Sequence, residues 1–137
     1  MPRLILYLWA LPTTCLGLPF LALAWLSGGR VRVVGGVIEA HGKGLATLLR
    51  WAPISGGASA MTLGHIVIGC SAECLDQTRD HERIHVRQVE RWGPLFIPAY
   101  FIGSLTAKMR GRDAYLDNPF EREAYRLTPE PGAMRRL

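Results

Sequence analysis

Two histidines and a glutamate are spaced in this chain so that they could hold a metal ion and use it. His81, Glu82 and His85 lie in the segment TRDHERIHVRQVERWGP, residues 78–94. Histidines at positions i and i+4 of a helix lie one turn apart, so two imidazole nitrogens can reach one ion. Glu82 lies beside the pair, where its carboxylate can take a proton from a metal-activated water. The motif therefore predicts a zinc site suited to hydrolysis.

The helix that positions these residues is predicted over 78–92. Thr78 can cap its first turn, and Gly93 can end it. At 100° per residue both histidines fall on one face, which is the apolar one, whereas Arg83 and Arg87 point to the opposite side. We therefore expect the histidines to face inward and the arginines to face outward.

A catalytic zinc takes three protein ligands and keeps a fourth position for water. The segment DNPFEREAYR, residues 117–126, offers carboxylates on a second short helix, which Asn118 can cap. Glu121 is the first candidate and Glu123 the second, on another face of that helix. Asn118 followed three residues later by Glu121 is also a capping-box arrangement, in which Glu121 would only bond the end of its own helix.

An HExxH motif followed by a later helix with a Glu-x-x-Ala pattern resembles the gluzincin zinc metallopeptidases. The resemblance covers roughly residues 60–126 and implies that His81, His85 and Glu121 bind Zn2+, with Glu82 as the general base. It also implies a peptide or protein substrate. Members of that family often have Asp where this chain has Tyr125. The longer pattern HERIHVRQ…RWGPLF…NPFEREAY is similar to a group of small bacterial membrane proteins.

Residues 4–26 form an apolar run of 23 residues without a charge. About 20 such residues span a bilayer, and Trp9 and Trp25 are spaced to lie one at each interface. We therefore expect residues 1–28 to be an anchor in a bacterial inner membrane. A secretory signal peptide and a buried helix of a soluble domain are the alternatives. Pro12 and Pro19 weigh against a straight span.

The rest of the chain is predicted to be one α+β domain over 29–128, followed by a tail over 129–137. The segment 30–42 reads as an antiparallel hairpin that turns at Gly35-Gly36. Two further elements are a strand or short helix over 45–51 and a strand over 61–70. The fold is thus a membrane helix, a small antiparallel sheet, the zinc helix, an apolar helix and the short Glu-bearing helix.

The balance of charges argues against nucleic acid as a partner. Residues 1–60 hold five Lys/Arg and one acid, a net of +4, and residues 61–137 hold eleven Lys/Arg and ten acids, a net of +1. The unpaired cations lie near the apolar run, which favours anionic membrane lipid as the partner. The cations that follow the run place the domain in the cytoplasm. Cys15, Cys70 and Cys74 are expected to be reduced thiols, which agrees with that compartment.

The sequence supports a membrane-anchored, metallopeptidase-like zinc hydrolase, with two alternatives. One is a non-catalytic membrane protein whose metal site is structural or lost. The other is a basic module that binds lipid surfaces. His41 and His65 read as ordinary strand or turn residues, although His65 or Tyr125 could assist the reaction.

Overall fold

The computed structural model describes residues 2–52 and 57–128, so the predicted tail over 129–137 lies outside the described residues. The described chain is an α+β fold, as predicted. In chain order its elements are α1 (Arg3–Leu26), β1 (Arg30–Val34), β2 (Val37–His41), α2 (Lys43–Arg50), β3 (Ala60–Leu63), β4 (Ile66–Gly69), α3 (Ala72–Trp92), the 3-10 turn η1 (Gly93–Leu95), α4 (Phe96–Met109) and α5 (Pro119–Leu127).

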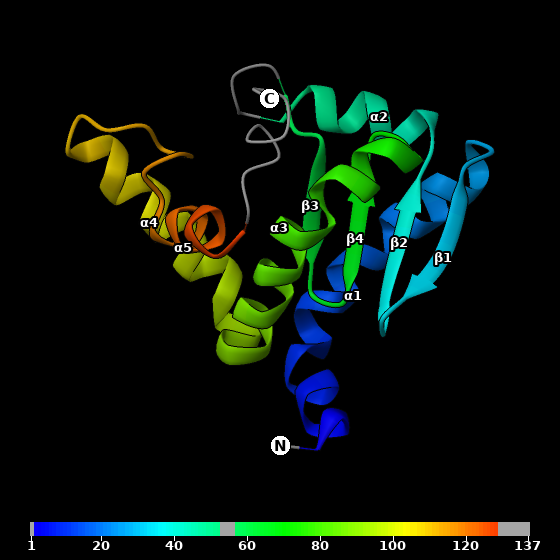
Figure 1. Cartoon of the computed structure of the whole chain (residues 1–137), viewed down its shortest axis with the longest axis horizontal. Helices are drawn as coiled ribbons and strands as arrows, with labels where there is room; N and C mark the ends of the chain where they lie inside the picture. The colour runs from blue at the N-terminus through cyan, green and yellow to red at the C-terminus, as the bar shows by residue number, and fades with distance from the viewer. Residues whose placement is uncertain (1, 53–56, 129–137) are drawn as a thin grey trace, which may run out of the picture.

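Two hairpins build a single four-stranded sheet with the order β1-β2-β4-β3 (Figure 1). The first hairpin, β1 and β2, is the predicted one, and both glycines of its turn have positive φ. The strand predicted over 61–70 is two strands instead, because the chain reverses at Gly64, where φ is +66°. The hairpins join through β2 and β4, which are parallel, so the sheet is mixed rather than wholly antiparallel. The predicted element over 45–51 is helical up to Arg50, as part of α2, and Trp51 follows as the cap.

Helices cover both faces of the sheet. Helices α1 and α2 pack on one face, where Ala24 and Leu45 meet Ile66 and Ile68 of β4. Helix α3 packs on the other face, where Leu75 and Val86 meet Val37 and Val67. Helices α4 and α5 lie beside α3, away from β1 (Figure 1). The zinc-motif helix is thus held between the sheet and the Glu-bearing helix.

Helix α1 is long and apolar enough to cross a membrane, and it is the one such helix in the described chain. It also packs along the sheet. The hydroxyl of Tyr7 donates to the carbonyl of Gly36, that of Thr13 donates to the carbonyl of Gly93, and Thr14 Oγ1 accepts from the amide of His65. Gly17 lies against Ile66, where an added Cβ would crowd the isoleucine.

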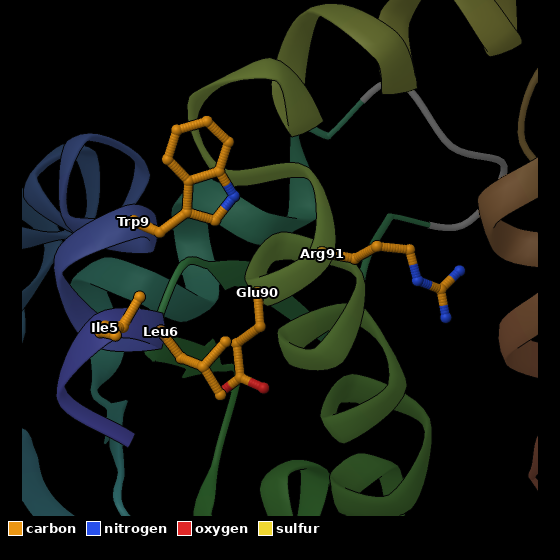
Figure 2. Close-up of a pocket in the computed structure, with 5 residues that line it drawn as sticks. All are labelled: Ile5, Leu6, Trp9, Glu90 and Arg91. Atoms are coloured by element: carbon orange, nitrogen blue, oxygen red, sulfur yellow. The ribbon is translucent and has the colours of Figure 1, made fainter. Parts of the chain in front are cut away.

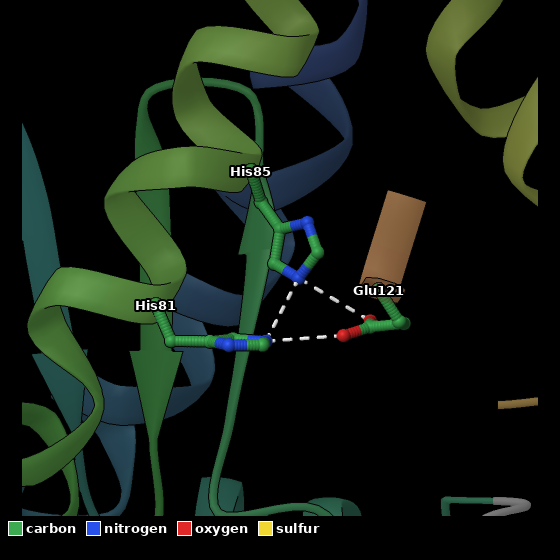
Figure 3. Close-up of side chains that lie close together, drawn as sticks. All are labelled: His81, His85 and Glu121. Carbon is green, nitrogen blue, oxygen red and sulfur yellow. Dashed lines mark hydrogen bonds and ion pairs between the residues drawn. The ribbon is translucent and has the colours of Figure 1, made fainter. Parts of the chain in front are cut away.

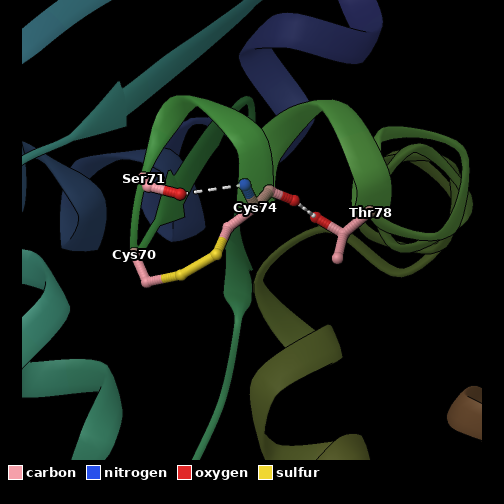
Figure 4. Close-up of a disulfide and its surroundings, with 4 residues drawn as sticks. All are labelled: Cys70, Ser71, Cys74 and Thr78. Carbon is pink, nitrogen blue, oxygen red and sulfur yellow. Dashed lines mark hydrogen bonds between the residues drawn. A yellow bond between two sulfur atoms is a disulfide. The ribbon is translucent and has the colours of Figure 1, made fainter.

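Helix α3 begins six residues before the predicted start. Ser71 is its cap and accepts a hydrogen bond from the amide of Cys74, whereas the hydroxyl of Thr78 bonds back to the carbonyl of Cys74 inside the helix (Figure 4). A disulfide joins Cys70, at the end of β4, to Cys74. The prediction of reduced thiols was therefore wrong for this pair and right for Cys15, which is free and exposed.

Candidate metal centre

The structure brings His81, His85 and Glu121 together from α3 and α5 (Figure 3). Nε2 of His81 lies 3.0 Å from Oε2 of Glu121, and Nε2 of His85 lies 3.2 Å from Oε1. The two Nε2 atoms lie 3.2 Å from each other. This group could hold a metal ion.

The separations suit a zinc tetrahedron. Bonds of about 2.0–2.1 Å at the tetrahedral angle place neighbouring ligand atoms about 3.3 Å apart. The three measured separations are 3.0, 3.2 and 3.2 Å. A cation could therefore enter with only a small outward movement of each side chain.

Gln88 fixes the tautomer of His85. Its amide nitrogen donates to two acceptors, the carbonyl of Phe120 at 3.0 Å and Oε2 of Glu123 at 2.7 Å. The amide oxygen therefore faces Nδ1 of His85, 2.8 Å away, and Nδ1 must be the donor. The lone pair of neutral His85 is then on Nε2, which points at the carboxylate of Glu121. Only a proton or a metal cation can stabilise that arrangement.

The charges around His85 favour a cation at this point. Burial opposes its charged form, but the bond to Glu121 and the charges of Glu82 and Glu121 outweigh burial and raise the pKa of His85 to about 9. Burial likewise opposes ionisation of Glu121. Its bonds to His81, His85 and Tyr100 prevail and lower its pKa to about 2.

Glu121 does not form the capping box that the sequence allowed. Asn118 caps α5 by accepting from the amide of Phe120, as predicted. The carboxylate of Glu121 turns away from this cap toward the histidines and is only 3% exposed. Glu123, the second candidate, bonds Gln88 and Arg91 instead and lies outside the metal group.

Glu82 is buried between α3 and β3. Its Oε2 accepts a hydrogen bond of 2.6 Å from the hydroxyl of Thr62. Its carboxylate is close enough to His85 for its charge to help raise the pKa of that histidine. Thr62 thus orients the carboxylate that the motif assigns as a base.

Sequence reasoning missed Tyr100 and the role of Gln88. The hydroxyl of Tyr100, on α4, donates to Oε1 of Glu121 at 2.7 Å. Tyr100 is the one ionisable residue in the apolar stretch 94–107, and this was an available signal. Gln88 lies three residues after His85, and this spacing places the two side chains on one helix face.

Tyr125 and His65, which the sequence suggested as possible assistants of the reaction, lie in different places. The ring of Tyr125 packs on that of His81, with centroids 4.5 Å apart. His65 lies elsewhere: its Nε2 contacts Oε1 of Glu90 at 2.8 Å, and its ring packs on Tyr7. His65 is therefore not part of the metal group.

Arg87 is exposed, as predicted, whereas Arg83 is partly buried and lies against the sheet. Arg79 forms two hydrogen bonds, of 2.9 and 2.8 Å, with the buried carboxylate of Glu39 on β2. Arg83 and Arg32 lie 3.4 and 3.3 Å from the same carboxylate. Glu39 thereby ties α3 to the sheet on the side opposite the histidines.

No family model, curated protein or solved structure matches this chain.

Proposed function

We propose that the protein is a zinc-dependent hydrolase that cleaves peptide bonds. The observation that carries the proposal is the convergence of His81, His85 and Glu121 on one point, with ligand separations that suit zinc. When bound, zinc would lower the pKa of a coordinated water and polarise a carbonyl group. The resemblance to gluzincin metallopeptidases supports the same ligands.

The chain's own groups have distinct roles in this proposal. His85 binds through Nε2 because Gln88 holds the proton on Nδ1. Tyr100 orients the carboxylate of Glu121. Glu82 takes the proton from the attacking water, and its bond to Thr62 keeps the carboxylate in place for that transfer.

An extended peptide is supported as substrate by the position of β3. This strand is at the edge of the sheet and carries Thr62, the partner of Glu82. An edge strand presents unpaired backbone groups to which an extended segment can add by main-chain hydrogen bonds. A peptide bound there would run past Glu82.

The test is a comparison of two Glu→Gln variants of α3. We expect Glu82→Gln to keep bound zinc and to lose peptide hydrolysis by about 10²–10⁴-fold, the usual contribution of a general base. Glu73→Gln makes the same chemical change at an exposed position of the same helix and should keep full activity. Zinc content and cleavage of unstructured peptides are measured on both. A Glu82→Gln variant with full activity would show that Glu82 is not the general base.

A structural, non-catalytic metal site is the second candidate. A metal ion bound by His81, His85 and Glu121 would hold α3 against α5 and, through Tyr100, against α4. Chelation separates the two functions. A structural site predicts that the zinc-free protein unfolds, whereas a catalytic site predicts loss of activity with the fold largely kept. A basic lipid-binding module is the third candidate. It predicts that His81→Ala changes neither the activity nor the stability of the protein.

Membrane association is part of the proposal. It is supported by the length and apolar character of α1 and by the cations near it. The bacterial inner membrane and a cytoplasmic domain stay predictions. The disulfide between Cys70 and Cys74 removes the support that reduced thiols gave to the cytoplasm.

A further inference from the structure

The way in which α1 packs restricts how it can meet a membrane. Its inner face contacts the domain from Tyr7, which bonds Gly36, to Ala24, which lies in the core with Ile66. At 1.5 Å per residue these contacts extend over about 26 Å of the helix. That length is close to the hydrocarbon thickness of a bilayer, about 30 Å.

A crossing orientation of α1 would therefore carry the sheet into the hydrocarbon. The edges of β1 and β3 have backbone groups that lipid cannot satisfy. Glu39 and its arginine partners would enter with them. With this packing, α1 cannot be a span that stands apart from the domain.

The outer face of α1 is nevertheless unsuited to water. The polar residues Tyr7, Thr13 and Thr14 all bond inward, to the domain or to α1 itself. The exposed side chains along the helix are large and apolar: Leu4, Ile5, Leu8, Trp9, Leu11, Leu16, Leu18, Trp25 and Leu26. A continuous apolar face of this length marks an interaction surface.

Aromatic and proline residues on α1 favour lipid at the headgroup boundary. Trp9 and Trp25 lie about 160° apart around the helix, which puts them on the two borders of the outer face. Tryptophan prefers that boundary. Pro12 and Pro19 point outward and leave the carbonyls of Leu8 and Cys15 without their usual helical partners. Those carbonyls can reach water or headgroups at the boundary but not in the bilayer centre.

Cations surround this apolar face. Arg3 and Arg30 flank the two ends of α1, Lys43 follows on α2, and none of the three takes part in an ion pair within residues 2–52 and 57–128. Ile5, Leu6 and Trp9 also line a hollow of about 540 Å³ whose other wall is formed by Glu90 and Arg91 (Figure 2). The three apolar residues of this hollow suit an acyl chain, whereas the cations that suit an anionic headgroup are Arg3, Arg30 and Lys43, which are free of ion pairs within the described residues.

We propose that the protein sits on one leaflet of an anionic bilayer, with α1 lying in the membrane plane. The outer face of α1 enters the acyl region, and the sheet takes the place of the polar face that interfacial helices usually carry. This inference deepens the membrane association proposed above but does not need a catalytic site. A His81→Ala variant should bind vesicles as well as the native protein does.

The test labels both ends of α1. In a Cys15→Ser background, Arg3→Cys and Arg30→Cys variants are reconstituted in vesicles of phosphatidylcholine and phosphatidylglycerol and treated with an impermeant maleimide. Cys70 and Cys74 are paired and do not react. A helix in the membrane plane gives equal labelled fractions at both positions. A variant with both cysteines removes the remaining ambiguity, because an in-plane helix then carries two labels or none per molecule, whereas a spanning helix carries one; one label per molecule would overturn the proposal.

Depth gives a second measurement. A fluorophore on the native Cys15, which is exposed on the outer face, should be quenched as if about 5–10 Å below the headgroups. Quenching from the bilayer centre, about 15 Å deep, contradicts the proposal. A protein that dimerises in solution and does not float with vesicles also contradicts it, because a second copy would then cover the face.

Matched substitutions check the surface itself. Leu8→Gln together with Leu11→Gln should weaken vesicle binding by about tenfold or more, since two exposed leucines lose their burial in lipid. Leu127→Gln, on α5, should leave binding unchanged. This leucine is equally exposed but belongs to a helix that packs on α3.

Discussion

Oε2 of Glu121 lies 3.0 Å from Nε2 of His81, although the two residues are 40 positions apart in the chain. The contact depends on how α5 docks against α3. Gln88 supports that docking because it donates to the carbonyl of Phe120, beside Glu121, while it accepts from His85. Ligand position and helix docking are therefore set by the same side chains.

Substitutions of the two carboxylates of α5, Glu121 and Glu123, should differ in their effect on zinc affinity. We expect Glu121→Gln to abolish measurable zinc binding at micromolar metal, because a neutral amide oxygen is a poor zinc ligand. Glu123→Gln should weaken affinity by only about 10–100-fold, because Glu123 acts through Gln88. Titration with a competing chelator measures both. Equal losses would mean that Glu121 is not a ligand.

Without Gln88, the proton of neutral His85 should no longer be fixed on Nδ1. The Gln88→Ala variant is expected to bind zinc about 10–100-fold more weakly, the usual effect of removing an outer partner of a ligating histidine. Gln77→Ala removes an exposed glutamine from the same helix and serves as the control. In the zinc-free proteins above pH 9, where His85 is neutral, NMR of the imidazole nitrogens should show mixed tautomers of His85 in the first variant only. An unchanged tautomer in Gln88→Ala would contradict the assignment.

The zinc-free protein should have a pH window of greatest stability. Because the pKa of His85 is raised from 6.5 to about 9, its contribution is complete below pH 6.5 and is lost as pH rises through 9. Because the pKa of Glu121 is lowered from 4.5 to about 2, its contribution is complete above pH 4.5 and is lost as pH falls through 2. Denaturant unfolding should therefore show a plateau between pH 4.5 and 6.5.

Zinc should reverse this dependence on the alkaline side. The ion needs neutral His85, so each pH unit below 9 should weaken zinc affinity by up to about tenfold. Binding at pH 7 should release a proton, which calorimetry in buffers of different ionisation enthalpy detects. Affinity that is independent of pH between 6 and 9 would exclude His85 as a ligand.

The carboxylate of Glu39 should be the most sensitive charge outside the metal group. Glu39→Gln leaves Arg79, Arg83 and Arg32 around a neutral side chain, and we expect it to lower the free energy of unfolding by roughly 2–4 kcal/mol. Urea denaturation measures the change. Glu73→Gln, at an exposed position of α3, should cost little. A loss no larger than that of Glu73→Gln would mean that α3 does not depend on this network.

Reduction of the disulfide should lower the stability of the fold but leave His81, His85 and Glu121 together. Cys70 and Cys74 close a loop of only five residues, so the entropic gain is about 2 kcal/mol. Unfolding with and without a thiol reductant measures it, and Cys15→Ser controls for other thiol effects. No difference between the two conditions would show that the pair is not oxidised in solution.

The sequence predicted those parts of the site that depend on local spacing. His81 and His85 are one helical turn apart in any helix, and Asn118 with Pro119 announces the start of α5. The bond from Tyr100 to Glu121 could not be predicted, since it depends on the docking of α4 beside α5. The parallel pairing of β2 with β4 depends in the same way on long-range packing.

Two predictions about α3, its first residue and the orientation of Arg83, were wrong for local reasons. Thr78 is an acceptable cap, but Ser71 lies at the end of β4, where the chain must turn, and so the helix begins there. Arg83 was placed outward because helical periodicity shows opposite faces without showing what covers them. Both faces of α3 are covered, one by α5 and one by the sheet.

The packing of α1 has a practical consequence for handling the protein. Deleting residues 1–28 is the usual way to obtain a soluble fragment of a protein with an apolar N-terminus. Here the truncation would strip one side of β4, uncover Ile66 and Ile68, and leave the amide of His65 without its acceptor Thr14. We expect such a fragment to aggregate. Detergent or nanodiscs around the full chain are the appropriate route to purified material.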